Sequence, residues 1–178
     1  DLDNEFDKIA QISNHIVFNS HAQYDTFKDR LLSNNSVGLR INPQFSSVEV
    51  DLYNPCGINS RLGIVKNNFK AYSIDNIDGL HFHALCEQNV DALEGVLNKF
   101  IQNFGEYFKD LKWVNFGGGH HITRADYDVK RLIEVLKDFK EKYPHLDVYM
   151  EPGEAIGWQT GYLESTVLDI AENGMQIA

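Results

Sequence analysis

Trp113-Val114-Asn115-Phe116-Gly117-Gly118-Gly119-His120-His121 joins a short apolar strand to a glycine-rich turn. Two other stretches have the same form. His81-Phe82-His83 ends the β-rich run that begins at residue 77, and Glu151-Pro152-Gly153-Glu154 ends the run that begins at residue 146. In alternating β/α proteins, functional groups gather where parallel strands end. The three motifs are therefore expected to meet at one edge of a parallel sheet.

The rest of the sequence alternates between short β-rich runs and helical periods. Strands are predicted at 15–18, 37–41, 77–83, 112–116 and 146–151, with a further candidate at 166–170. Helices are predicted at 3–12, from the Asn19-Ser20 cap to about Leu32, at 90–108 and at 126–142, while 44–75 reads as irregular. This order predicts an α/β fold with a parallel sheet and right-handed crossovers.

The length of the chain limits which parallel fold it can hold. A (β/α)8 barrel of the TIM type takes about 250 residues, so the 178 residues are expected to form only part of one. The chain opens in a helical pattern and stops in an apolar run, which also favours a partial barrel. A complete five-stranded doubly wound domain is the alternative.

The composition favours an ordinary globular protein of the cytoplasm. Sixteen basic and 26 acidic side chains give a net charge of −10, which argues against a nucleic-acid partner. No apolar run is long enough for a membrane span, and the acidic start lacks the pattern of a signal peptide. Two cysteines, Cys56 and Cys86, are too few for a disulfide framework.

Each motif allows more than one interpretation. His81 and His83 are expected to share a face of their strand, either as half-buried side chains, as a stacking partner for a flat cofactor, or as a metal pair of a barrel hydrolase. The three glycines can form an anion-binding nest or a plain tight turn. Glu151 can bind a protonated pyridine nitrogen, ligate a metal or cap a turn. Arg40, inside an apolar strand, needs an anionic partner.

Taken in order, the motifs resemble the pyridoxal-phosphate decarboxylases of the alanine-racemase-like barrel class. The phrases that carry the resemblance are 79–87, 115–123 and 151–155, and they are most similar to the carboxynorspermidine (carboxyspermidine) decarboxylase branch. The likeness extends over the whole chain, including 17–20 and 60–64. It implies a lyase of polyamine and spermidine biosynthesis that decarboxylates a carboxylated triamine with pyridoxal 5'-phosphate and without a metal.

The resemblance also implies roles for individual residues. His83 stacks on the pyridine ring, Cys86 approaches the phosphate, Glu151 binds the pyridine nitrogen and Arg40 lies near the cofactor. The phosphate is wrapped by the loop of Gly117, Gly118 and Gly119. Glu154 stands where better-known relatives have an arginine that helps to hold the phosphate. It is expected either to face away from the phosphate or to bind an amine of the substrate, and His121 is also expected to contact the substrate.

Other implications concern the intact protein. The Schiff-base lysine of the family lies on the first barrel strand and its β-rich second domain follows the barrel, so neither is expected within 1–178. The chain alone is therefore expected to be inactive, and the intact enzyme to be a homodimer. Two alternatives stay open. One is a metal-dependent barrel hydrolase using His81 and His83, and the other is a related diaminopimelate or ornithine decarboxylase.

Overall fold

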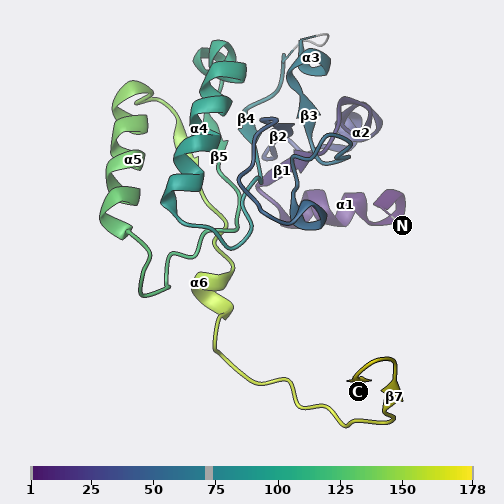
Figure 1. The fold of residues 1–178 in the computed structure, drawn as a ribbon. Helices are drawn as coiled ribbons and strands as arrows, with labels where there is room; N and C mark the ends of the chain where they lie inside the picture. Colours follow the sequence, from purple (N-terminus) through teal and green to yellow (C-terminus); the bar gives the residue numbers. More distant parts are fainter. Residues whose placement is uncertain (1, 71–73, 178) are drawn as a thin grey trace.

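The computed structural model describes residues 2–70 and 74–177, in which helices and strands alternate along the chain (Figure 1). The predicted irregular stretch at 44–75 includes residues 71–73, which lie outside the described part. The helical elements are α1 (Leu2–Ile12), α2 (His21–Phe27), η1 (Lys28–Arg30), η2 (Asp51–Tyr53), α3 (Lys66–Phe69), α4 (Val90–Phe104), η3 (Gly105–Asp110), α5 (Val129–Lys142) and α6 (Glu154–Gly157). The strands are β1 (His15–Phe18), β2 (Ser36–Asn42), β3 (Ile64–Val65), β4 (Gly79–His81), β5 (Trp113–Asn115), β6 (Asp147–Tyr149), β7 (Ala171–Glu172) and β8 (Gln176–Ile177).

The main sheet is parallel, as the sequence predicts. Its order is β1-β2-β4-β5-β6, and the short β3 pairs with the end of β2. Each strand thus lies beside the next of these strands along the chain, as in consecutive strands of a β/α barrel. The prediction of a parallel α/β fold is confirmed.

On one face of this sheet, polar and unusually small residues form rows that cross the strands. Residues paired in register on neighbouring parallel strands point to the same side of a sheet, so each row lies on one face. The first row consists of Gly38, Gly79, Trp113 and Asp147, and the second of Arg40, His81, Asn115 and Tyr149. Trp113 occupies the space that the two glycines leave, since a Cβ on Gly38 or Gly79 would lie 2.3 or 2.1 Å from its indole. The second row stands at the carboxyl ends of the strands.

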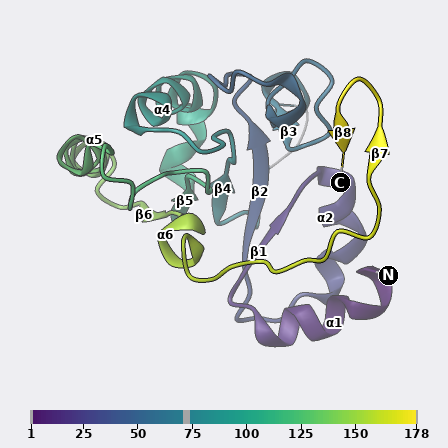
Figure 2. The same cartoon turned by 60° about the horizontal axis from the view of Figure 1, so that its bottom comes forward.

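The opposite face is apolar and packs against the helices (Figure 2). Leu39, Leu80 and Val114 form its central row, and all three are fully buried. Phenylalanines link the strand ends to the helices: Phe82 stacks on Phe116 at 5.4 Å between ring centroids. Phe100 of α4 and Phe139 of α5 pack edge-on against this pair. The strand ends that carry the motifs are thus anchored from behind by the core.

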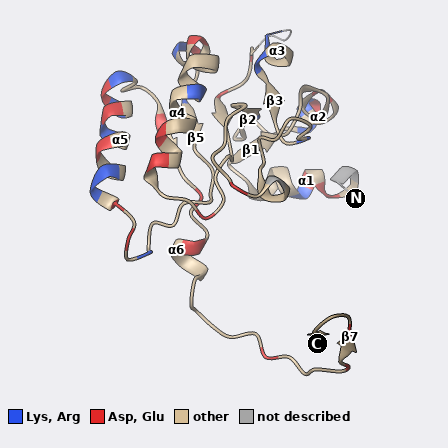
Figure 3. Ribbon diagram, viewed as in Figure 1, with Lys and Arg blue, Asp and Glu red and all other residues tan. Residues whose placement is uncertain are grey.

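Basic and acidic residues alternate along α5 (Figure 3). Arg131 pairs with Glu94 of α4 and with Glu134 one turn further along α5. The sequence predicts this helix from residue 126, but it begins at Val129 because the Asp128 side chain accepts a hydrogen bond from the Arg131 amide and caps it. None of the described helices combines the length and apolar character that a bilayer span requires.

The candidate strand at 166–170 is not formed. These residues lie in an extended, exposed segment that leads away from α6 to the small β7–β8 hairpin (Figure 1). A run of β-branched and apolar residues becomes a strand only where another strand pairs with it. Within the described part of the chain, no strand pairs with this segment.

The cap of α2 allows a test of local stability. Ser20 Oγ accepts a hydrogen bond from the Gln23 amide, and Gln23 Oε1 accepts one from the Asn19 amide, so two donors at the helix start are satisfied. Ser20→Ala is expected to lower the free energy of unfolding by about 1 kcal/mol. Urea unfolding followed by circular dichroism measures the change. Ser33→Ala, in an exposed turn, is the control, and an equal loss in both variants would contradict the role of the cap.

Candidate active site

Glu151 lies at the centre of the predicted site. Its Oε1 accepts a 2.8 Å hydrogen bond from the Asn115 side-chain amide, and its Oε2 lies 3.7 Å from His81 Nε2. The backbone amide of Glu151 donates to the Gly117 carbonyl, so β6 continues its pairing with the glycine loop past the end of the strand. The side chain remains 53% exposed. The carboxylate is thus held in place by one oxygen while the group as a whole stays accessible.

Asn115 is a site residue that the sequence did not identify. Besides holding Glu151, its Oδ1 accepts a hydrogen bond from the Gly117 amide at 2.8 Å. One amide side chain therefore fixes both the carboxylate and the first glycine of the loop. Asn115 is the last residue of β5 and lies directly before the glycine motif, and this position in the sequence could have indicated its role in the site.

The ring of His83 is held by the same loop. The Gly118 amide donates to His83 Nδ1 at 3.3 Å, so in the neutral ring the proton is on Nε2. Burial lowers the pKa of His83, and the nearby Arg40 charge lowers it further against the opposing effect of Glu151. The structure thus places a neutral, oriented imidazole beside Glu151.

The glycine loop is pressed against the segment that follows β4. A Cβ on Gly117 would lie 2.3 Å from the Phe82 carbonyl oxygen, and one on Gly119 would lie 2.2 Å from that of Leu85. Both glycines also have positive φ, +66° and +82°. A Cβ on Gly118 would lie 2.6 Å from the Glu151 carbonyl oxygen. All three positions therefore require glycine. A tight turn alone would explain the positive φ angles but not the close backbone contacts at all three positions.

Arg40 adds a positive charge to the second row of the sheet. Burial lowers its pKa, while the negative charge of Glu151 opposes this shift. One guanidinium nitrogen lies 3.5 Å from the His83 carbonyl oxygen. Burial also raises the pKa of Cys56 to about 11, so this thiol stays protonated at neutral pH. Arg40 thus places a positive charge at the carboxyl ends of the strands, where an anionic ligand could use it.

Cys86 lies next to the loop but faces elsewhere. Its backbone nitrogen is 2.9 Å from the position of a Cβ on Gly119, whereas the residue is exposed and lines a hollow of about 420 Å3 together with Val48 and Tyr53. The prediction that Cys86 approaches a phosphate stays a prediction, and it would have to act through its backbone or after a rotation of its side chain.

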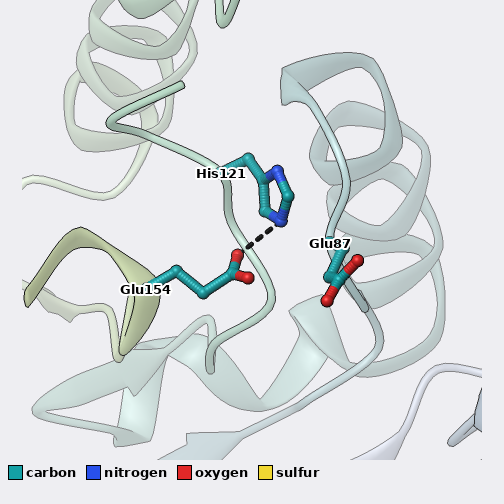
Figure 4. Close-up of side chains that lie close together, drawn as sticks. All are labelled: Glu87, His121 and Glu154. Carbon is teal, nitrogen blue, oxygen red and sulfur yellow. Dashed lines mark ion pairs between the residues drawn. The ribbon is translucent and has the colours of Figure 1, made fainter. Parts of the chain in front are cut away.

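Glu154 and His121 form a second group beside the first. His121 Nε2 lies 2.5 Å from Glu154 Oε2, and Glu87 completes a set whose potential ligand atoms all lie within 4.8 Å of one another (Figure 4). The ring of Trp158 lies 5.7 Å from that of His121. In the described part of the chain this is the one such set of three histidine, cysteine or acidic residues, so His81 and His83 are not joined by a third close ligand.

The buried His81 predicts an acid-sensitive fold. Burial lowers its pKa to about 4, although Glu151 opposes the shift. The unfolded chain takes up this proton near its ordinary pKa of about 6.5, so stability is expected to fall as pH drops from about 6.5 to 4, by on the order of 1–3 kcal/mol. Thermal unfolding between pH 7 and 4 measures the loss. His81→Asn is expected to reduce this pH dependence, and equal slopes would contradict it.

Solved structures of barrel decarboxylases that use pyridoxal phosphate share the architecture of this chain. A solved structure of diaminopimelate decarboxylase, for example, matches 85% of this chain and 39% of its own, with a TM-score of 0.67 at 21% identity. A lysine decarboxylase solved with the cofactor shares the fold at lower similarity. At these identities the likeness shows the fold alone, and no protein-family model matches the chain.

Within this class the chain is similar to carboxynorspermidine/carboxyspermidine decarboxylase. It is 53% identical to that enzyme of Campylobacter jejuni subsp. jejuni serotype O:6 over 176 residues, which are 99% of this chain and 46% of the relative. The crystal structure of the Campylobacter jejuni carboxynorspermidine decarboxylase with norspermidine matches 97% of this chain and 44% of its own, with a TM-score of 0.80 and 50% identity. The resemblance predicted from the motifs is confirmed. The chain spans less than half the length of this relative.

Proposed function

We propose that the protein carrying this chain is a decarboxylase that removes CO2 from carboxynorspermidine or carboxyspermidine with pyridoxal phosphate. The observation that supports this most directly is the arrangement of His83, Glu151 and the glycine loop at the carboxyl ends of adjacent parallel strands. The similarity to carboxynorspermidine decarboxylase over nearly the whole chain adds the reaction and the substrate class.

The residues fit the cofactor in three respects. The glycine loop has no room for side chains and can bring its backbone close to a phosphate. The amides of Gly117 and Gly118 already donate to Asn115 and His83, so the phosphate is expected at the Gly119 end of the loop. His83 offers a flat, oriented ring. Glu151 offers a carboxylate acceptor for a protonated ring nitrogen.

Each group has a distinct part in the proposed reaction. When bound, pyridoxal phosphate supplies the electron sink for the pair that is left as CO2 departs. Glu151 would accept a hydrogen bond from the pyridine nitrogen and so favour a proton there, and Asn115 holds the carboxylate in position. His83 would stack on the face of the cofactor ring. Arg40, in the second row of the sheet, balances the negative charge of Glu151.

The test is a direct assay of the full-length protein. With pyridoxal phosphate added, it is expected to convert carboxynorspermidine into norspermidine and CO2, measured by chromatography and trapped CO2. Diaminopimelate and ornithine are assayed alongside. Activity confined to diaminopimelate or ornithine would favour the related amino-acid decarboxylase. Turnover that does not require pyridoxal phosphate and is lost when a metal chelator is added would favour the hydrolase.

We further propose that the full-length protein is a cytoplasmic homodimer. Both cysteines are free, as expected for a reducing compartment. The family resemblance implies the dimer, and β1 and β6 are edge strands in the described sheet, which leaves backbone groups available for further contacts. Light scattering on the active protein tests the dimer, and full activity as a monomer would refute it.

A further inference from the structure

The group of Glu87, His121 and Glu154 is assembled by three successive strand ends. Glu87 follows β4, His121 follows β5 and its glycine loop, and Glu154 begins α6 after β6. The first two segments are joined by their backbones, since the Gln88 amide donates to the Gly119 carbonyl and the His121 amide to the Gln88 carbonyl. The three side chains therefore converge because the fold fixes their segments, and Figure 4 shows them facing one another.

The tautomer of His121 is set by Arg124. The guanidinium lies 3.0 Å from His121 Nδ1, and because an arginine can only donate, Nδ1 must be the acceptor. Arg124 is itself held by Asp126 at 2.5 Å and by the Asn89 side chain at 2.6 Å. In the neutral ring the proton is thus on Nε2, the atom that faces Glu154 and Glu87.

This tautomer decides which ligand the group suits. A metal ion would need the lone pair of Nε2, and the proton would then have to move to Nδ1, against the Arg124 donor. A ligand that donates hydrogen bonds needs no such change, because the carboxylates of Glu87 and Glu154 accept them. The chemistry therefore favours a cationic amine over a metal ion.

The group also has accessible acceptors for a further donor. His121 is 8% exposed and its Nε2 lies 2.5 Å from Glu154 Oε2, whereas the Glu154 side chain is 34% exposed and Glu87 is exposed. An ammonium group entering between the two carboxylates would donate to their accessible oxygens and be charge-paired by two acids. Charge-assisted bonds of this kind are among the stronger polar contacts in proteins.

We propose that Glu87 and Glu154, with Glu154 positioned by His121, form the subsite for an ammonium group of a polyamine. This inference rests on the proposed function, since it assigns the binding of the substrate's amine tail at the same strand ends. Glu154 lies three residues after Glu151, so the subsite adjoins the carboxylate that is proposed to hold the cofactor. The position that is arginine in better-known relatives would thus serve the substrate here.

The experiment measures norspermidine binding to the full-length protein by isothermal titration calorimetry. Glu87→Gln and Glu154→Gln each remove one charge and keep the shape, and each is expected to weaken binding by about tenfold or more. Glu141→Gln, on the exposed side of α5, is the matched control and is expected to stay within about twofold. Circular dichroism confirms that each variant is folded.

Two results would overturn the proposal. One is an unchanged dissociation constant in both variants. The other is stoichiometric binding of Mn2+ or Zn2+ by the wild type that both variants lose, which would make the group a metal site. Failure here is distinguishable from failure of the proposed function. Decarboxylation of carboxynorspermidine with an unchanged KM in both variants refutes the subsite alone, whereas weakened norspermidine binding without any CO2 release refutes the decarboxylase alone.

Discussion

Gly119→Ala is expected to lower the free energy of unfolding by about 3 kcal/mol or more, or to prevent folding. The new Cβ would lie 2.2 Å from the carbonyl oxygen of Leu85 and 2.4 Å from its carbonyl carbon, at a φ of +82°. These are backbone atoms, so no side-chain rotation relieves the contact. The segment cannot easily withdraw either, because the Gln88 amide donates to the Gly119 carbonyl.

Thermal unfolding of the full-length variant by circular dichroism gives the measurement. Gly157→Ala is the matched control, since nothing lies within 4 Å of a Cβ there and its φ is not positive. That variant is expected to be neutral or slightly more stable. If Gly119→Ala unfolds at the same temperature as Gly157→Ala, the loop is not packed as described.

Glu151→Gln is expected to lower the rate of decarboxylation of carboxynorspermidine by about a hundredfold or more. Glutamine keeps the shape and an oxygen that can accept from Asn115, but it cannot hold a proton on the pyridine nitrogen as a carboxylate does. The cofactor is still expected to bind, because the glycine loop and His83 are unchanged. The effect should therefore appear in kcat more than in cofactor occupancy.

Turnover and the absorbance of bound cofactor are measured together on the full-length protein. Glu141→Gln makes the same chemical change on the outer surface of α5 and should keep wild-type turnover. A Glu151→Gln enzyme that retains a third or more of the wild-type kcat would show that Glu151 does not support the ring nitrogen.

The sequence predicts the fold well because a short local pattern of residues specifies each main strand of the sheet. Apolar strands such as 37–41 and 112–116 are bounded by glycine, proline or asparagine, and the structure places β2 and β5 there within a residue or so. The prediction at 166–170 was wrong for a physical reason. Strand formation there depends on a pairing partner, and local composition contains no information about one.

The site was predictable only in part. His83, Glu151 and the glycine loop each follow a strand, so their convergence could be expected from topology. Asn115 was missed because its two hydrogen bonds join residues 2 and 36 positions away in the sequence. Glu87 was missed for a similar reason, since its approach to His121 depends on how two loops pack. Contacts between loops depend on tertiary structure, and the periodicity of apolar residues in the sequence does not predict them.

The two tryptophans give the molecule two separate optical reporters. Trp113 is 3% exposed beneath the strand ends, so its emission is expected to follow the integrity of the sheet. Trp158 is 44% exposed, with its ring beside His121, so its emission is expected to respond to charge entering next to Glu154. Their different exposure separates the two signals by wavelength and by quencher access. Unfolding and ligand entry can therefore be followed in one unlabelled sample.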